Sequence, residues 1–212
     1  MAVASAPPVL TQVAHRFAQT SRGIVGFRLH RVLDVHAGFS KYHREIVLAG
    51  IYQNGRLVRV RVISYTIDGR PTDAGQQAAL AQEYQNPKPG ETFAAPFDAR
   101  NFAAYSYQEQ GPGTIAFSST LHDAGHGNGT FTYDATNSVL ACTYQPNVLP
   151  PHATWGEIAD RWAEVLPNYR AVTQETQNYK GRYGPFAGTA IEQVDYSNFR
   201  RFSNLRSALN AL

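Results

Sequence analysis

Three of the seven histidines are the residues best suited to chemistry. His122 and His126 stand four residues apart with Asp123 between them, and His152 follows two prolines. Together they could bind zinc, since imidazole and carboxylate groups suit that metal, or supply the general base of a hydrolase. Histidines at this spacing bind metal best on a helix, and the surrounding glycines oppose a helix. We therefore expect a mobile polar loop without a metal site, and a hydrolase that uses His122, His126 or His152 is the weakest alternative.

Other reactive side chains lack the partners that catalysis needs. Glu45, Glu175 and Asp195 lie in strand-like segments, where paired carboxylates could hydrolyse a glycoside, but exposed strand positions are the usual explanation. Cys142 is the only cysteine and stands in an alternating apolar run, which predicts a buried, inert thiol. The chain has no G-x-S-x-G motif and no G-K-[ST] phosphate loop. The sequence therefore predicts a protein that is not an enzyme and needs no cofactor.

Composition points to a single large β-rich domain. The chain has 212 residues, of which 17% are charged and 12% are aromatic. All-β domains commonly run to ~200–250 residues. The net charge is +3, and the basic residues are scattered except around Arg56, Arg59 and Arg61. Such a weak basic patch argues against nucleic acid as a partner. No apolar run approaches the ~18–20 residues that span a bilayer, so we expect no transmembrane segment.

The strongest structural signal lies in residues 42–67, where two alternating runs are joined by Asn54-Gly55. This dipeptide favours a two-residue hairpin turn, which pairs Gln53 with Arg56. Each strand has roughly 11 residues and spans about 36 Å, twice the usual length, which predicts a large, curved sheet. Continued pairing puts an aliphatic set on one face: Val47, Ala49, Ile51, Val58, Val60 and Val62. The opposite, solvent-facing set contains Arg44, Arg59, Arg61, Tyr52 and Tyr65.

Two helices and about ten or eleven strands in meander order account for the rest of the chain. Residues 9–20 show helical spacing, and residues 73–84 read as a helix with a polar N-cap. Residues 154–166 fit either a helix or a strand, and their neighbours in a meander favour a strand. From residue 23 the apolar period is two, so one face of a long strand holds Val25, Phe27, Leu29, Leu33 and Val35.

Both ends of the chain are expected to be tails. We predict a disordered N-terminal tail at 1–8, a single domain at 9–203 and a C-terminal tail at 204–212. The start, MAVASAPPVL, has the composition of a mature N-terminus, because small residues and prolines often follow a cleaved leader. We therefore expect a periplasmic or secreted protein whose signal peptide has been removed.

The order of these elements resembles the LolA/LolB-like family of periplasmic lipoprotein carriers. IDGRPT, followed by a helix and a Pro break, is similar to the segment that crosses the mouth in that family. GNGTFTYDATNSVLACTYQPNVLP is similar to its strand–turn–strand unit, and GRYGPFAGTAIEQVDYSNFRRFS to the closing strands of exported LolA-like proteins. The resemblance implies a mainly β (α+β) fold. In it a strongly curved antiparallel meander forms an incomplete barrel, and two helices cover an apolar concave side that holds acyl chains.

The predicted function is that of an exported carrier or sensor for lipidated or other apolar cargo, without chemistry. A curled sheet that does not close leaves an apolar concavity, which helices or a ligand must fill. Membrane-associated proteins are expected as further partners. The alternative is an interaction or assembly module whose exposed sheet edges add a partner's strand. The residues predicted to line the concave side are Phe27, Leu29, Val47, Ile51, Val58, Val60 and Val62.

Overall fold

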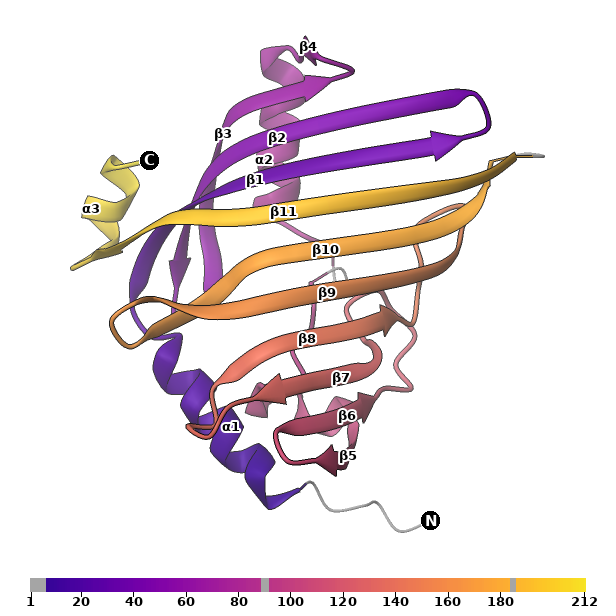
Figure 1. Cartoon of the computed structure of the whole chain (residues 1–212). Coiled ribbons are helices and arrows are strands. Elements are labelled where there is room, and N and C mark those ends of the chain that lie inside the picture. Colours follow the sequence, from indigo (N-terminus) through magenta and orange to yellow (C-terminus); the bar gives the residue numbers. More distant parts are fainter. Residues whose placement is uncertain (1–6, 89–91, 184–185) are drawn as a thin grey trace.

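The computed structural model describes residues 7–88, 92–183 and 186–212. Within them the chain forms one curved antiparallel sheet of eleven strands (Figure 1). The strand order is β4-β3-β2-β1-β11-β10-β9-β8-β7-β6-β5, so the first long strand pairs with the last and the sheet stays open at β4 and β5. This is the incomplete barrel that the sequence predicted. The strands are β1 Ile24–Ala37, β2 Ser40–Gln53, β3 Arg56–Ile67, β4 Arg70–Pro71, β5 Ser106–Gly111, β6 Thr114–Ser118, β7 Gly127–Tyr133, β8 Val139–Pro146, β9 Ala153–Leu166, β10 Tyr169–Tyr183 and β11 Phe186–Phe202.

Both predicted helices are present. The helices are α1 Pro8–Thr20, α2 Ala74–Gln85, the 3₁₀ helix η1 Ala99–Ala104 and α3 Leu205–Asn210. Asp73 caps α2: its carboxylate accepts from the backbone N–H of Gln76, whose side chain accepts from the Asp73 N–H in return. This reciprocal capping box satisfies two donors that a helix start otherwise leaves unpaired. The ambiguous segment 154–166 is strand β9, because β8 and β10 pair with it on both sides.

The β2–β3 hairpin begins as predicted and then departs from the predicted register. Asn54 and Gly55 adopt φ of 50° and 75°, the left-handed conformation of a two-residue turn, and Gln53 pairs with Arg56. Beyond Leu57 the pairing slips, because β-bulges leave Val58 and Ile63 as extra residues on β3. Each bulge inserts one residue and so exchanges the two faces of the bulged strand relative to its partner.

The bulges break up the predicted aliphatic face. Gly50 pairs with Val60 and Leu48 with Val62, so these two β3 valines share a face with the even-numbered residues of β2. Val47 and Ile51 therefore lie on the opposite face, and Val58, within the first bulge, is 38% exposed.

The predicted arginine face is corrected in the same way. Arg59 and Arg61 pair with Ile51 and Ala49 and are solvent-exposed, as expected. Arg44 does not join them. It points to the same side of the sheet as Leu33, its partner on β1.

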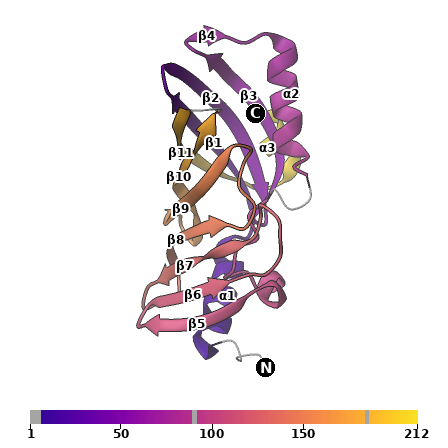
Figure 2. The same cartoon turned by 90° about the vertical axis from the view of Figure 1, so that its right-hand side faces the viewer.

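The helices α1 and α2 cover the same side of the sheet at opposite ends. Leu10 and Val13 of α1 pack into a cluster with residues of β6–β8, and Leu80 of α2 packs against Leu48 and Val60. We call this covered side the concave face. Figure 2 shows α2 standing beside β1–β3 along the edge of the curved sheet.

The two predicted tails differ. Residues 1–6 of the N-terminal tail lie outside the described residues. The C-terminal segment contains α3, which contacts β1 and β11 and buries Ala208. Among the described residues, no helix has both the length and the apolar character needed to cross a membrane.

Candidate functional site

Pairing registers place the side chains of the concave face in rows that run across the strands. One row joins Arg31 of β1, Val194 of β11, Glu175 of β10 and Asp160 of β9. The next row, towards the β1–β2 turn, contains Arg44, Leu33, Glu192, Gln177 and Ile158. Directly paired residues of antiparallel strands project to the same side, so both rows face the concavity.

Aromatic side chains fill the concave face over β5–β8. The Phe97 ring is fully buried, and its centroid lies 5.0 Å from Phe17 of α1, 5.4 Å from Phe131 and 5.5 Å from Trp162, each pair meeting edge to face. Such contacts add to the stabilisation that burial itself provides. We call this region the aromatic half. It is defined by its buried residues Leu10, Val13, Phe97, Tyr105, Tyr107, Ile115, Phe117, Phe131, Val139, Cys142, Tyr144 and Ile158.

A second cluster lies under α2, over β1–β3 and β11. The Phe27 ring stacks on Tyr52 with centroids 4.4 Å apart. It occupies the space beside Gly50, where any Cβ would collide with the ring, so a glycine is required on β2 at this point. The buried residues of this cluster are Phe27, Leu29, Ile46, Leu48, Val60, Leu80 and Val194.

Charged and polar groups separate the two clusters from a cavity at the end of the face. Arg31 Nη2 donates to Glu192 Oε2 at 2.6 Å, and Arg44 Nη2 donates to Glu192 Oε1 at 3.2 Å. Arg31 Nη1 also donates to the hydroxyl of Tyr84 on α2, at 2.6 Å. Because Glu192 is only 5% exposed, its charge depends on these two guanidinium groups. We call the set Arg31, Arg44, Asp160, Glu175, Gln177 and Glu192 the polar band.

Two carboxyl groups face each other within the polar band. Asp160 and Glu175 are direct cross-strand partners, and Asp160 is 5% exposed. Burial, followed by the charge of Glu175, raises the pKa of Asp160 to about 8, and burial also raises the pKa of Glu175. Gln177 Nε2 donates to Glu175 Oε1 at 2.5 Å, whereas Asp160 Oδ1 has no hydrogen-bond partner among the described residues. The pair is therefore arranged to hold a proton at neutral pH.

A cavity of about 290 Å³ opens beyond the polar band, towards the β1–β2 turn. Its floor follows the next rows of the sheet, where Val35 pairs with Ala190 and where Gly188 and Gly181 are neighbours. These small side chains leave the space open. We call it the mouth cavity. Its lining consists of Leu33, Val35, Arg44, Pro150, Pro151, His152, Ala153, Gln177, Tyr179, Lys180, Gly181, Gly188, Thr189, Ala190 and Glu192.

The predicted lining residues and the observed mouth cavity do not coincide. Phe27 and Leu29 lie on the concave face but are buried in the cluster under α2. Val60 and Val62 line a wide depression of about 460 Å³ between β3 and α2. The predictions that Val47, Ile51 and Val58 also face inward are wrong for the register reasons given above.

Leu33 and Val35 are the cavity residues with a sequence signal, since they continue the apolar stripe of β1. Asp160, Gly181 and Gly188 carry no comparable sequence signal, because their positions matter only once it is known which strands become neighbours.

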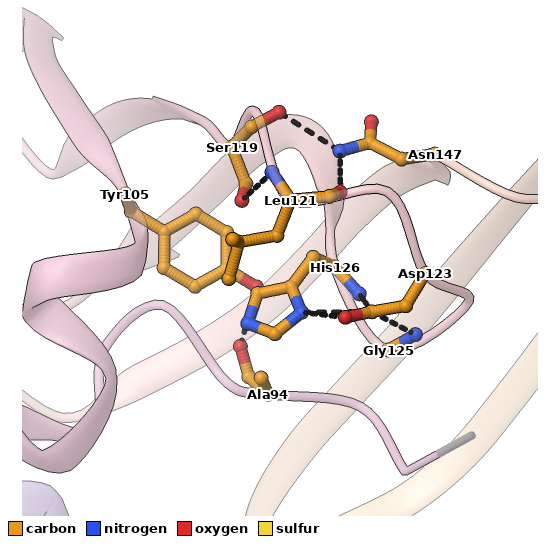
Figure 3. Close-up of polar contacts among 8 residues, drawn as sticks. All are labelled: Ala94, Tyr105, Ser119, Leu121, Asp123, Gly125, His126 and Asn147. Atoms are coloured by element: carbon orange, nitrogen blue, oxygen red, sulfur yellow. Dashed lines mark hydrogen bonds and ion pairs between the residues drawn. The ribbon is translucent and has the colours of Figure 1, made fainter. Parts of the chain in front are cut away.

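The histidine segment is a loop held together by its own hydrogen bonds. Asp123 Oδ1 accepts from the backbone N–H of Gly125 at 2.9 Å and from His126 Nδ1 at 2.8 Å (Figure 3). The hydrogen bond from His126 lowers the pKa of Asp123. Asn147 closes the loop by donating to the carbonyls of Ser119 and Leu121.

The predicted histidine set does not form a ligand group. Over the described ranges, no three His, Cys, Asp or Glu side chains are grouped as metal ligands would be, and this includes His122, His126 and His152. The glycosidase candidates each have another polar partner. Glu45 pairs with His30 at 2.7 Å, and Asp195 accepts from Gln174, whereas Glu175 faces Asp160. Burial strongly raises the pKa of the Cys142 thiol, which fits the inert thiol expected.

Solved structures that align with most of this chain are distant from it in sequence. A candidate outer membrane lipoprotein-sorting protein domain from Vibrio parahaemolyticus is 11% identical, with a TM-score of 0.48 over 92% of this chain and 93% of that one. A DUF1329 family protein from Desulfovibrio piger is 10% identical, with a TM-score of 0.44 over 94% of each chain. A lipovitellin structure concerned with lipid–protein interactions is 10% identical, with a TM-score of 0.43 over 86% of this chain and 26% of that one. Neither a family model nor a curated protein matches the sequence.

Proposed function

We propose that this protein is an exported, non-enzymatic carrier or sensor that holds an acyl chain of a lipid or of a lipidated protein in the mouth cavity. The observation that carries the proposal is the contrast within one concave face. Side chains of α1 and α2 fill the face on one side of the polar band, whereas the rows around Val35 and Ala190 leave about 290 Å³ open. Apolar concavities of this kind are the usual sites of small hydrophobic ligands.

The size of the cavity suits a single chain. Small-molecule sites typically occupy about 300–1,000 Å³, and the mouth cavity lies at the lower end of this range. Burial contributes about 0.8 kcal/mol per methylene, so about ten methylenes would supply roughly 8 kcal/mol. That free energy corresponds to a dissociation constant of about 1 μM, which is strong enough to hold cargo and weak enough to release it.

The charges around the cavity favour a cargo with a polar or anionic head group. Arg44 lies at its inner end, whereas the Lys180 side chain projects to the opposite side of the sheet with its cross-strand partner Trp155. The one carboxylate in the lining, Glu192, is already held by Arg31 and Arg44. An acyl chain therefore enters a site whose uncompensated charge is positive.

Cargo copurification and a pair of matched variants test the proposal. Protein purified from its host is examined by native mass spectrometry, and the emptied protein is titrated with a fluorescent fatty acid. Ala190→Phe projects a ring into the cavity and is expected to weaken binding at least tenfold. Ile191→Phe is the control, because Ile191 is the next residue along β11, faces the opposite side and is 44% exposed.

Two results would overturn the proposal. One is a wild-type protein that carries no lipid from its host and also fails to bind the fatty acid. The other is an Ala190→Phe variant that is folded and binds as tightly as Ile191→Phe.

A further inference from the structure

Two exposed phenylalanines stand together at one end of the sheet. Phe39, in the β1–β2 turn, is 100% exposed, and Phe186, at the start of β11, is 48% exposed. The pairing of Ala37 with Gly188 makes these two strand ends neighbours. A Cβ at Gly38 would lie 2.7 Å from Phe186 Cδ1, so the Phe186 ring rests against the β1–β2 turn. Figure 1 shows the β1–β2 hairpin and the start of β11 projecting to the same side of the molecule.

The same end of the molecule is rich in cations. Residues 35–42, 149–155 and 179–190 contain Lys41, Lys180 and Arg182 but no Asp or Glu. All three are solvent-exposed.

Nearby carboxylates do not cancel this charge at the turn itself. Asp34 pairs with His43 at 2.8 Å, and Asp68 accepts from the His43 backbone N–H. Both carboxylates are therefore engaged by His43 of β2, several residues away from the β1–β2 turn. Lys41 and Arg182 form no ion pair within the described part of the chain. The Lys180 Nζ atom lies 5.1 Å from the centroid of the Trp155 ring.

We propose that Phe39 and Phe186, with Lys41, Lys180 and Arg182, form a rim that docks on an anionic phospholipid surface. Exposed aromatic rings next to cations suit the boundary between head groups and acyl chains, because the rings enter the apolar layer while the cations stay at the phosphates. Lys180, Gly181 and Gly188 belong both to this end and to the lining of the mouth cavity. Docking would therefore point the cavity at the bilayer. The rim shares only Lys180 with the cavity lining, and neither phenylalanine belongs to that lining, so the proposal does not depend on the proposed cargo.

Vesicle sedimentation tests the rim directly. Wild-type protein is mixed with vesicles of phosphatidylglycerol and phosphatidylcholine in equal amounts, and with vesicles of phosphatidylcholine alone, at low and at physiological salt. We expect sedimentation with the anionic vesicles, weakening with salt, and little with the neutral ones. Lys41→Gln, Lys180→Gln and Arg182→Gln combined should weaken binding well over tenfold, since each cation near an anionic surface contributes roughly a fivefold effect.

The aromatic contribution is measured with a matched pair of double variants. Phe39→Ser with Phe186→Ser is expected to weaken binding about tenfold or more, because two apolar side chains leave the bilayer boundary. Ile63→Ser with Leu140→Ser is the control, since these residues are 40% and 41% exposed but lie on β3 and β8 away from the rim. Thermal unfolding of every variant checks that the fold is retained.

The outcomes separate this proposal from the carrier function. The docking proposal would be overturned by wild-type protein that does not sediment with anionic vesicles. It would also be overturned by a folded Phe39/Phe186 double variant that binds them as strongly as its control. Equal binding to neutral vesicles would overturn the role of the cations. Fatty-acid binding is measured in parallel, and it should survive the loss of Phe39 and Phe186 even though docking is lost.

Discussion

The aromatic half and the mouth cavity are two parts of one concave face, and they are used in opposite ways. In the aromatic half, α1 and the segment around Phe97 supply rings that interlock with Phe131 and Trp162. At the mouth, the corresponding positions hold Val35, Ala190 and glycines, and about 290 Å³ stays open. A single sheet thus provides both a hydrophobic core and an open cavity, and side-chain size decides which one each region becomes.

The polar band keeps the two uses apart. Burying charge is costly unless the charges are paired, so Arg31, Arg44 and Glu192 form a boundary that side chains of the core do not cross. Stability is expected to depend on residues on one side of this boundary, and binding on residues on the other.

The largest expected effect comes from removing the centre of the aromatic half. Phe97→Ala deletes a fully buried ring and should lower the free energy of unfolding by about 3–5 kcal/mol. Val35→Ala at the mouth should cost less than about 1 kcal/mol, because its neighbours already border open space. Urea unfolding of the two variants measures both values. Equal losses in the free energy of unfolding would show that the mouth is packed as tightly as the aromatic half, which contradicts the proposed difference between them.

The next effect concerns the boundary and depends on pH. The raised pKa of Asp160 means that the folded state holds a proton that the unfolded state releases above its ordinary value of 3.8. Asp160 therefore contributes stability that is present below that value and is lost as the pH rises towards and through about 8. Asp160→Asn removes the titration, so the variant should gain on wild type as the pH rises from 5 to 8.

The gain in stability of Asp160→Asn over wild type is measurable as a difference in melting temperature. Each unit of pKa shift corresponds to about 1.4 kcal/mol, and 1 kcal/mol moves the melting temperature of a chain of this size by about 2–4 °C. Melting curves at pH 5 and pH 8 should show the difference between variant and wild type growing by several degrees. Parallel curves at the two pH values would mean that the pair does not retain its proton.

The smallest effect concerns the helix above the band. Tyr84→Phe removes the hydroxyl that accepts from Arg31, which should cost about 1.5 kcal/mol, the value of a hydrogen bond to a charged group. The loss is local to α2, so amide hydrogen exchange should speed up there and stay unchanged in α1. Faster exchange in both helices would show that the two ends of the concave face unfold together.

The strands and helices could be predicted because their signals are local. Asn54 and Gly55 tolerate the positive φ that a two-residue turn requires, and Asp73 and Gln76 complete their capping box within one turn. The bulges at Val58 and Ile63 could not be predicted in this way. Their position depends on how β3 twists against β2 and packs under α2, so the valines assigned to the lining by simple alternation ended on different faces.

Alternation and turn residues act over a few positions, so the amino-acid sequence alone predicts that this chain forms long antiparallel strands. The positions of the proposed cavity and rim depend on the tertiary structure, because each requires distant segments to meet. Asp160 meets Glu175 through the β9–β10 pairing, and the Phe186 ring lies against the β1–β2 turn because β1 pairs with β11, across almost the whole chain. The free energy of closing such long-range contacts comes from the whole sheet, which is why no short motif reveals them.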